Sequence, residues 1–369
     1  MFGDPRRGHP VAAFGRTAAA LEARDYGDSR VRGAAHTAAC VLAVGVPAAL
    51  VQRGTRTRPL LRFASVAAMT WAVTGARSLR RVAGQAGDAL DADDLPAARE
   101  ILPSLCGRDP AGLGGKEIAR AVVESVAENT SDAVVAPLLW GAVAGLPGLA
   151  AYRAINTLDA MIGHHSPRYE RYGWAAARLD DVANYIPARV TALLTVACAG
   201  APHWVNYVID IARTGQSRNR PTADGGAAGQ RTADAWCAFR RYGARHPSPN
   251  AGRCEAAFAG ALGVRLGGAN VYQGITETRQ ELGDGRPPEP ADIRRATSLS
   301  RAVTIAATAA AAAIAVSTAA WAAMTRPPAG NYKAAGHGRR ETRSRAARRP
   351  AGRGATSPAA GGRSANRPT

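Results

Sequence analysis

Residues 119–152 read ARAVVESVAENTSDAVVAPLLWGAVAGLPGLAAY, so a row of acidic side chains runs directly into an apolar segment. Residues 133–152 carry no charge, and as a helix they are long enough to cross a bilayer. They also contain Pro137, Gly145 and Pro147, which favour a helix that is broken or re-entrant. The stretch therefore predicts a membrane-embedded segment that does not simply span.

Four other stretches lack charged residues, namely residues 34–51, 63–76, 190–209 and 302–324. Soluble proteins seldom contain several such stretches, and patterns typical of strands are scarce. We therefore expect an all-α, polytopic integral membrane protein with about four to five apolar helices, some of them re-entrant, joined by helical soluble segments. Buried helices of a soluble all-α protein are the alternative interpretation.

The positive charge is concentrated at the end of the chain. The net charge is +19, and residues 325–369 contain 11 Lys or Arg residues and one acid. The composition of these residues predicts a basic disordered tail that contacts anionic lipid, after a membrane domain at residues 1–324. A specific nucleic-acid partner is not expected. The five cysteines form no CxxC pair and predict no disulfide framework.

One group of candidate site residues lies on the helix expected before residue 133. Arg120, Glu124, Glu128 and Asp132 are spaced four apart and share a helix face. The three acids repel one another unless a cation lies against them, and hydrated Mg²⁺ suits them because it takes one or two carboxylates and keeps its waters. A solvated helix face is the alternative.

A second group follows the apolar segment. It comprises polar side chains suited to metal, amine and phosphate binding: Arg153, Asn156, Asp159, Arg178, Asp180, Asp181 and Asn184. Ordinary ion pairing at helix ends would also explain these residues. If residues 133–152 crossed the membrane, the two groups would lie on opposite sides, so one shared site requires a re-entrant segment.

A third group is the sequence HPSPN, in which two prolines fix a turn between His246 and Asn250. A rigid polar loop is a common location for binding residues, although a structural turn explains it equally well. The sequence Gly114-Gly115-Lys116 is not a P-loop, because Glu117 stands where a Ser or Thr is required. ATP use therefore does not follow from spacing.

With these groups in view, the chain resembles the CobD/CbiB family, the adenosylcobinamide-phosphate synthases of cobalamin biosynthesis, from residue 3 to about residue 300. The resemblance rests on GDP and HP (residues 3–5 and 9–10), GRD (107–109), VESVAENTSD (123–132), APL (136–138), YRAINTLDAM (152–161), RLDD (178–181) and HPSPN (246–250). Family members usually begin with an apolar helix before the GDP motif. They usually have Gly at the position of Ala133 and Thr at that of Pro110.

The resemblance implies an ATP-dependent amide ligase of the cell membrane. It would join aminopropanol, or its phosphate, to a propionate of adenosylcobyric acid, with Mg²⁺ as cofactor and cobalt only within the corrinoid substrate. Membrane lipid and other cobalamin-assembly membrane proteins are the further partners expected.

The roles that we assign on this basis fall into four sets. They are Mg²⁺ ligands (Glu124, Glu128, Asp132), phosphate-binding arginines (Arg153, Arg178), groups that act on the amine or in catalysis (Glu124, Glu128, Asp159, Asp180, Asp181, His246) and further substrate or ATP contacts (Arg108, Asp109, Asn129, Asn156, Asn184, Asn250). A non-catalytic membrane sensor or scaffold of a related regulatory family is the alternative, and a transporter of corrinoid precursors is a third.

Overall fold

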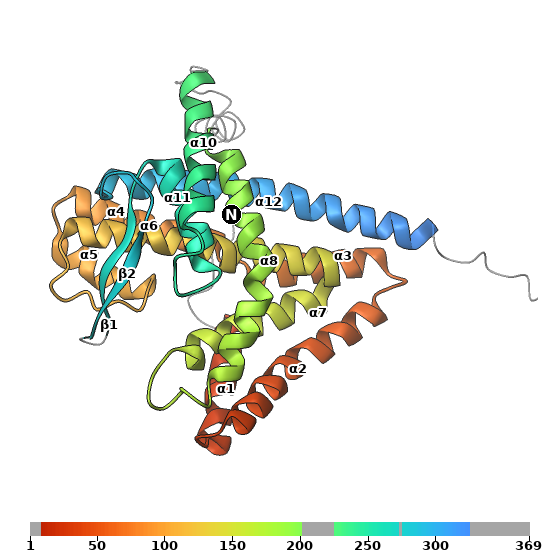
Figure 1. Cartoon of the computed structure of the whole chain (residues 1–369). Helices are drawn as coiled ribbons and strands as arrows, with labels where there is room; N and C mark the ends of the chain where they lie inside the picture. Colours follow the sequence, from red (N-terminus) through yellow and green to blue (C-terminus); the bar gives the residue numbers. More distant parts are fainter. Residues whose placement is uncertain (1–8, 201–224, 273–274, 325–369) are drawn as a thin grey trace, which may run out of the picture. The chain divides into compact units, whose positions relative to one another are not determined.

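The computed structural model describes residues 9–200, 225–272 and 275–324, and most of them are helical (Figure 1). Three helical segments are long and apolar enough to cross a membrane: α2 (Arg30–Gly54), the continuous run Gly115–Gly163, and Pro290–Thr318 of helix α12 (Pro290–Met324). Helix α3 (Pro59–Val73) is apolar but has 15 residues. The expectation of an all-α membrane protein is confirmed, with three candidate spans in the described residues. Part of the stretch 190–209 lies outside them.

Large apolar side chains are exposed on these helices, as a lipid-facing surface requires. Leu50 on α2 is 64% exposed, and Phe63 on α3 is 74% exposed. Helix α1 (Pro10–Asp25), whose first turn is capped by His9, packs beside α2 and α7.

The central segment is a broken hairpin. A π-helical turn (Ser131–Val135) leads into α7 (Ala136–Leu158), and a second π-helical turn (Asp159–Gly163) follows it. Within α7, Gly145 has φ 69° and ψ −142°, a conformation open essentially to glycine alone. A Cβ at Gly148 would lie 2.3 Å from the carbonyl oxygen of Trp140, so the two halves pack closely. The predicted break is confirmed.

Two contacts hold the ends of this hairpin. At its tip, Gln52 of α2 accepts a hydrogen bond from Leu146 N (2.8 Å). At its base, the hydroxyl of Tyr152 donates to the carbonyl oxygen of Asp132 (3.0 Å). The chain that leaves at Asp132 therefore returns to the same level at Tyr152, and the groups that flank the apolar segment in sequence meet in space.

The remaining helices build a polar lobe. It contains α4 (Ala76–Asp91), α5 (Leu95–Ile101), α6 (Gly115–Thr130), α10 (Gly225–Tyr242), α11 (Ala251–Leu262) and the start of α12. Fully buried Leu102, Val122, Phe258 and Ile293 belong to its core. Asp94 caps the start of α5 by accepting a hydrogen bond from Ala97 N (3.0 Å). Helix α8 (Trp174–Cys198) packs against both the lobe and the hairpin.

A two-stranded antiparallel sheet, β1 (Leu266–Tyr272) and β2 (Ile275–Leu282), lies on the lobe and was not predicted. Its first strand contains Gly267 and Gly268 with φ of 82° and 84°, which a side chain would disfavour. Arg120 of α6 donates to the carbonyl oxygens of Gly267 and Ala269. Helix α6 therefore fixes the position of the two-stranded sheet formed by β1 and β2.

Candidate functional site at the base of the hairpin

A chain of hydrogen bonds links the groups that flank the apolar segment to helices α8 and α11. The Tyr152 hydroxyl donates to Asn184 Oδ1 (2.8 Å), and Asn184 Nδ2 donates to Asp180 Oδ2 (2.9 Å). Asn250, the residue before α11, donates to the carbonyl oxygen of Asp181 (2.8 Å). Three groups of residues that are far apart in sequence are therefore brought together.

The centre of this region is an acid cluster, which comprises Glu128, Asp132, Asp159 and Asp180. The negative charges of Asp180, Glu128 and Asp159 all act on Asp132. In the described part of the chain, the side chains of Glu128, Asp132 and Asp159 make no hydrogen bond or ion pair. Glu128 is exposed to solvent. The charges of Arg279, Asp180 and Arg108 also act on its carboxylate. The cluster is therefore open to solvent at Glu128, while its other three acids are half-buried, and a bound cation would relieve the repulsion among them.

The donor set fits a hydrated Mg²⁺ ion. Among the described residues, no group of three or more His, Cys, Asp or Glu side chains is close enough to hold one metal ion together. A single ion would therefore take one or two of these carboxylates and fill its shell with water and substrate oxygens, as Mg²⁺ characteristically does. The magnesium site stays a prediction, and Glu128 and Asp132 are its best-placed ligands.

Glu124 is placed differently from the other acids of its row. It forms a buried ion pair with Arg108, and its second oxygen accepts a hydrogen bond from Gly267 N (2.6 Å). Both carboxylate oxygens are therefore occupied by protein. Glu124 therefore differs from the other two predicted magnesium ligands, because its carboxylate connects α6 to the preceding loop and to β1.

The two aspartates of α8 titrate differently from free aspartate. Burial raises the pKa of Asp180 to about 6, although hydrogen bonds from Asn184 and Asn156 act in the opposite direction. Burial also raises the pKa of Asp181, against the effect of Arg178, which lies 3.6 Å from it. Near pH 7 Asp180 is therefore a carboxylate that accepts a proton more readily than a free one.

His246 lies beside Arg279 of β2 and is held in one orientation. Its Nδ1 accepts a hydrogen bond from Ser248 N (3.0 Å), so a neutral ring carries its proton on Nε2. That nitrogen lies 3.2 Å from Nη1 of Arg279. Burial, and then the charge of Arg279, lower the pKa of His246 to about 4. The Nε2–H and the guanidinium are thus two donors next to each other, an arrangement that a bound anion would relieve. The low pKa disfavours His246 as the base for the amine.

Two residues of this region were missed from sequence. Arg279 lies on a strand that was not expected, so nothing indicated its position. Glu255 is 4% exposed on α11. Burial, followed by the charges of Glu124 and Glu128, raises its pKa well above the usual range. One acid directly before the apolar run AAFAGAL (residues 256–262) was a signal that could have identified Glu255.

Other predicted residues lie at the edge of the site. Asp109 accepts a hydrogen bond from Ala111 N (2.9 Å) and stabilises its own turn. Asn129 donates to the carbonyl oxygen of Ser125 (3.0 Å) and so bends back along its helix. Arg178 is exposed and reaches Asp181. These contacts leave their predicted roles as substrate or ATP contacts without structural support.

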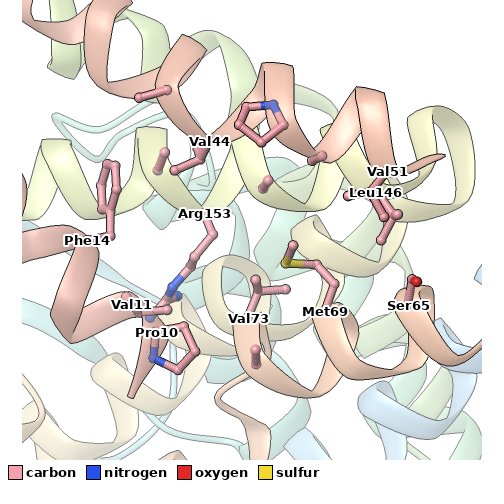
Figure 2. Close-up of a pocket in the computed structure, with 16 residues that line it drawn as sticks. Pro10, Val11, Phe14, Val44, Val51, Ser65, Met69, Val73, Leu146 and Arg153 are labelled. Atoms are coloured by element: carbon pink, nitrogen blue, oxygen red, sulfur yellow. The ribbon is translucent and has the colours of Figure 1, made fainter. Parts of the chain in front are cut away.

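Arg153 lines an apolar pocket (Figure 2), and its positive charge also acts on Asp132 of the acid cluster. Its guanidinium also donates to Asn156 Oδ1 (3.4 Å). The pocket has a volume of about 410 Å³, and its other lining residues come from α1, α2, α3 and α7. Val44, Met69 and Leu146 are among them. The arginine therefore places a positive charge where the polar site borders the apolar helices.

Fold and site together define a helical membrane protein whose polar centre lies at the base of a broken helical hairpin. The model of the family described as CobD/Cbib protein matches residues 1–300. The chain is 54% identical over 304 residues to the "Cobalamin biosynthesis protein CobD" of Mycobacterium tuberculosis strain H37Rv, which covers 82% of this chain and 88% of that protein.

More distant relatives carry the same name. The protein from Geobacter metallireducens is 41% identical over 305 residues, or 80% of this chain and 87% of its own length. That from Stutzerimonas stutzeri is 40% identical over 301 residues, or 81% and 88%. No solved structure matches the chain. The chain belongs to the CobD/CbiB family.

Proposed function

We propose that this protein is an enzyme of cobalamin biosynthesis that joins aminopropanol, or its phosphate, to a propionate of adenosylcobyric acid while ATP is hydrolysed. Membership of the CobD/CbiB family supports the pathway. The observation that carries the proposal is the half-buried acid cluster, open to solvent at Glu128, on which the charges of Arg153 and Arg279 act. Such costly polar groups next to apolar helices are typical of a functional site, and a scaffold has no need of them.

The chemistry requires activation of a carboxylate, which is a poor acyl donor. In the proposed reaction, the carboxylate oxygen attacks the γ-phosphorus of ATP, and an acyl phosphate and ADP form. The neutral amine nitrogen then attacks the acyl carbon, the C–N bond forms, and the C–O bond breaks to release phosphate. The ammonium must lose one proton before it attacks, so the site needs a base.

We assign the proton-accepting role to Asp180 or Asp159 in the acid cluster. The raised pKa of Asp180, about 6, leaves it ionised near pH 7 and makes it a better base than an ordinary aspartate. The Nε2–H of His246 and the guanidinium of Arg279 would bind an anionic group together. Arg153 would contact a phosphate from the opposite side, as its position beside Asp132 allows.

Glu128 and Asp132 would hold Mg²⁺, which when bound supplies positive charge that neutralises the phosphates. The Arg108–Glu124 pair positions α6 rather than contacting the nucleotide. We propose a multi-pass location in the cell membrane, in contact with lipid and with other membrane proteins of cobalamin assembly.

Complementation tests the proposed function. The gene should restore cobalamin synthesis to a strain blocked before cobinamide when that strain is fed cobyric acid, and it should be dispensable when cobinamide is supplied. Glu128→Gln should abolish rescue while the protein remains in the membrane. Glu117→Gln, at an exposed acid in the first turn of the same helix, is the matched control and should rescue fully. Full rescue by Glu128→Gln would remove Glu128 from the mechanism.

A further inference from the structure

Arginines gather where helix α4 packs against helix α12, away from the acid cluster. Arg77, Arg80 and Arg81 lie in the first two turns of α4, and Arg301 lies on α12. Arg77 and Arg81 are exposed, whereas Arg80 and Arg301 are partly buried. In the described part of the chain, Arg77, Arg80 and Arg81 form no ion pair.

Arg80 and Arg301 hold two like charges close together. Nη1 of Arg80 donates to the hydroxyl of Thr304 on α12 (3.1 Å), which fixes the guanidinium against that helix. Burial, and then the positive charge of Arg301, lower the pKa of Arg80 to about 10. The two guanidinium groups carry like charges and repel each other. An anion bound to both would attract each of them and so offset this repulsion.

The apolar surroundings indicate where that anion comes from. Arg301 immediately precedes the uncharged residues 302–324, and Arg77 immediately follows the uncharged residues 63–76. Trp71 near the end of α3 is 43% exposed, and Ile305, one turn after Arg301, is 46% exposed. A tryptophan beside cationic residues at the end of an apolar helix is typical of the membrane interface. An anion that binds here would therefore have apolar neighbours on the membrane side.

We propose that the α4–α12 junction binds the phosphate of one anionic phospholipid, held by Arg80 and Arg301 with its acyl chains along Trp71 and Ile305. The interaction would anchor the polar lobe at one surface of the bilayer. It would also keep α4 and α12 together despite their like charges. This lipid site is separate from the acid cluster and does not depend on the proposed ligase activity.

The test is lipid binding to the full-length protein in neutral detergent by native mass spectrometry. Phosphatidylglycerol, phosphatidylcholine and inorganic phosphate are the probes. Wild type should bind one phosphatidylglycerol more tightly than phosphatidylcholine. Arg80→Gln and Arg301→Gln should each weaken that binding about fivefold. Arg56→Gln, which removes an exposed arginine from the turn before α3, should have no effect.

Three results would overturn the proposal: equal binding of the two lipids, equal losses in Arg56→Gln and Arg80→Gln, or inorganic phosphate binding that competes fully with phosphatidylglycerol. The last would assign the site to a soluble anion. Because Arg80 is partly buried, Arg80→Lys serves as a second variant that retains the charge. It should bind phosphatidylglycerol more tightly than Arg80→Gln does, and identical binding by the two variants would contradict a role for the charge.

Discussion

The ion pair between Arg108 and Glu124 offers a prediction that separates a structural from a metal-binding role. Arg108 is 8% exposed and Glu124 is 4% exposed. Glu124→Gln removes the carboxylate that neutralises a buried guanidinium, while the amide oxygen can still accept the hydrogen bond from Gly267 N. Loss of one partner from a buried ion pair typically costs about 3–5 kcal/mol. We expect the free energy of unfolding to fall by that amount.

The double variant decides whether the loss comes from the pair. Arg108→Gln alone should destabilise to a similar degree, because it leaves the Glu124 carboxylate buried. Combined with Glu124→Gln it should cost less than the sum of the single changes, with a coupling of about 2–3 kcal/mol. Denaturant unfolding of the detergent-solubilised protein, followed by tryptophan fluorescence, measures all four proteins.

The exposed pair of Arg265 and Glu281, 3.3 Å apart, is the matched control. Its side chains are 41% and 57% exposed, so its coupling should be about 0–1 kcal/mol. A cost below about 1 kcal/mol for Glu124→Gln, or a coupling no larger than that of the control pair, would refute the structural role. It would return Glu124 to the set of magnesium ligands.

Three further predictions concern the hairpin and the acid cluster. Gly145→Ala should destabilise the protein by about 1–3 kcal/mol through backbone strain and further by a clash with the Gln52 side chain. The control Gly84→Ala, at an open position within α4, should leave the stability unchanged or raise it. Equal thermal midpoints for Gly145→Ala and Gly84→Ala would contradict the break in the helix at Gly145. Asp180→Asn should abolish ligation yet raise the thermal midpoint. This rise in the midpoint should be larger near about pH 7 than near about pH 4, because a carboxylate with a raised pKa costs stability only where it is ionised. A gain independent of pH would be inconsistent with that shift. Tyr152→Phe removes hydrogen bonds to two polar groups of the site and should lower the ligation rate more than it lowers binding of ATP; an unchanged rate would show that these bonds do not position the site.

The broken hairpin could be predicted from sequence because its cause is local. Pro137, Gly145 and Pro147 lie in one uncharged run, and a positive φ at Gly145 needs no information from elsewhere in the chain. The spacing of Glu128 and Asp132 on one helix face is equally local. The turn formed by HPSPN was predictable for the same reason, since its two prolines restrict the backbone.

The partners of the charged side chains could not be predicted in this way. Arg120 and Glu124 are four residues apart on one helix face, a spacing that suits an ion pair, yet the structure pairs Glu124 with Arg108 and directs Arg120 to β1. The two glycines of β1 carry no hydrophobic pattern that would indicate a strand. The position of Arg279 in the site could therefore not be predicted, because it depends on a tertiary contact between β2 and the HPSPN turn.

The proposed site requires that the apolar segment folds back, so that the acids before it and the polar groups after it share one side of the membrane. Single cysteines at Glu117 and Arg171, both exposed and on either side of the hairpin in sequence, test this in sealed vesicles with a membrane-impermeant thiol reagent. The background should lack the exposed Cys237. We predict that both positions are labelled from the same side. Labelling from opposite sides would show that the segment spans the bilayer, and a shared site would then be impossible.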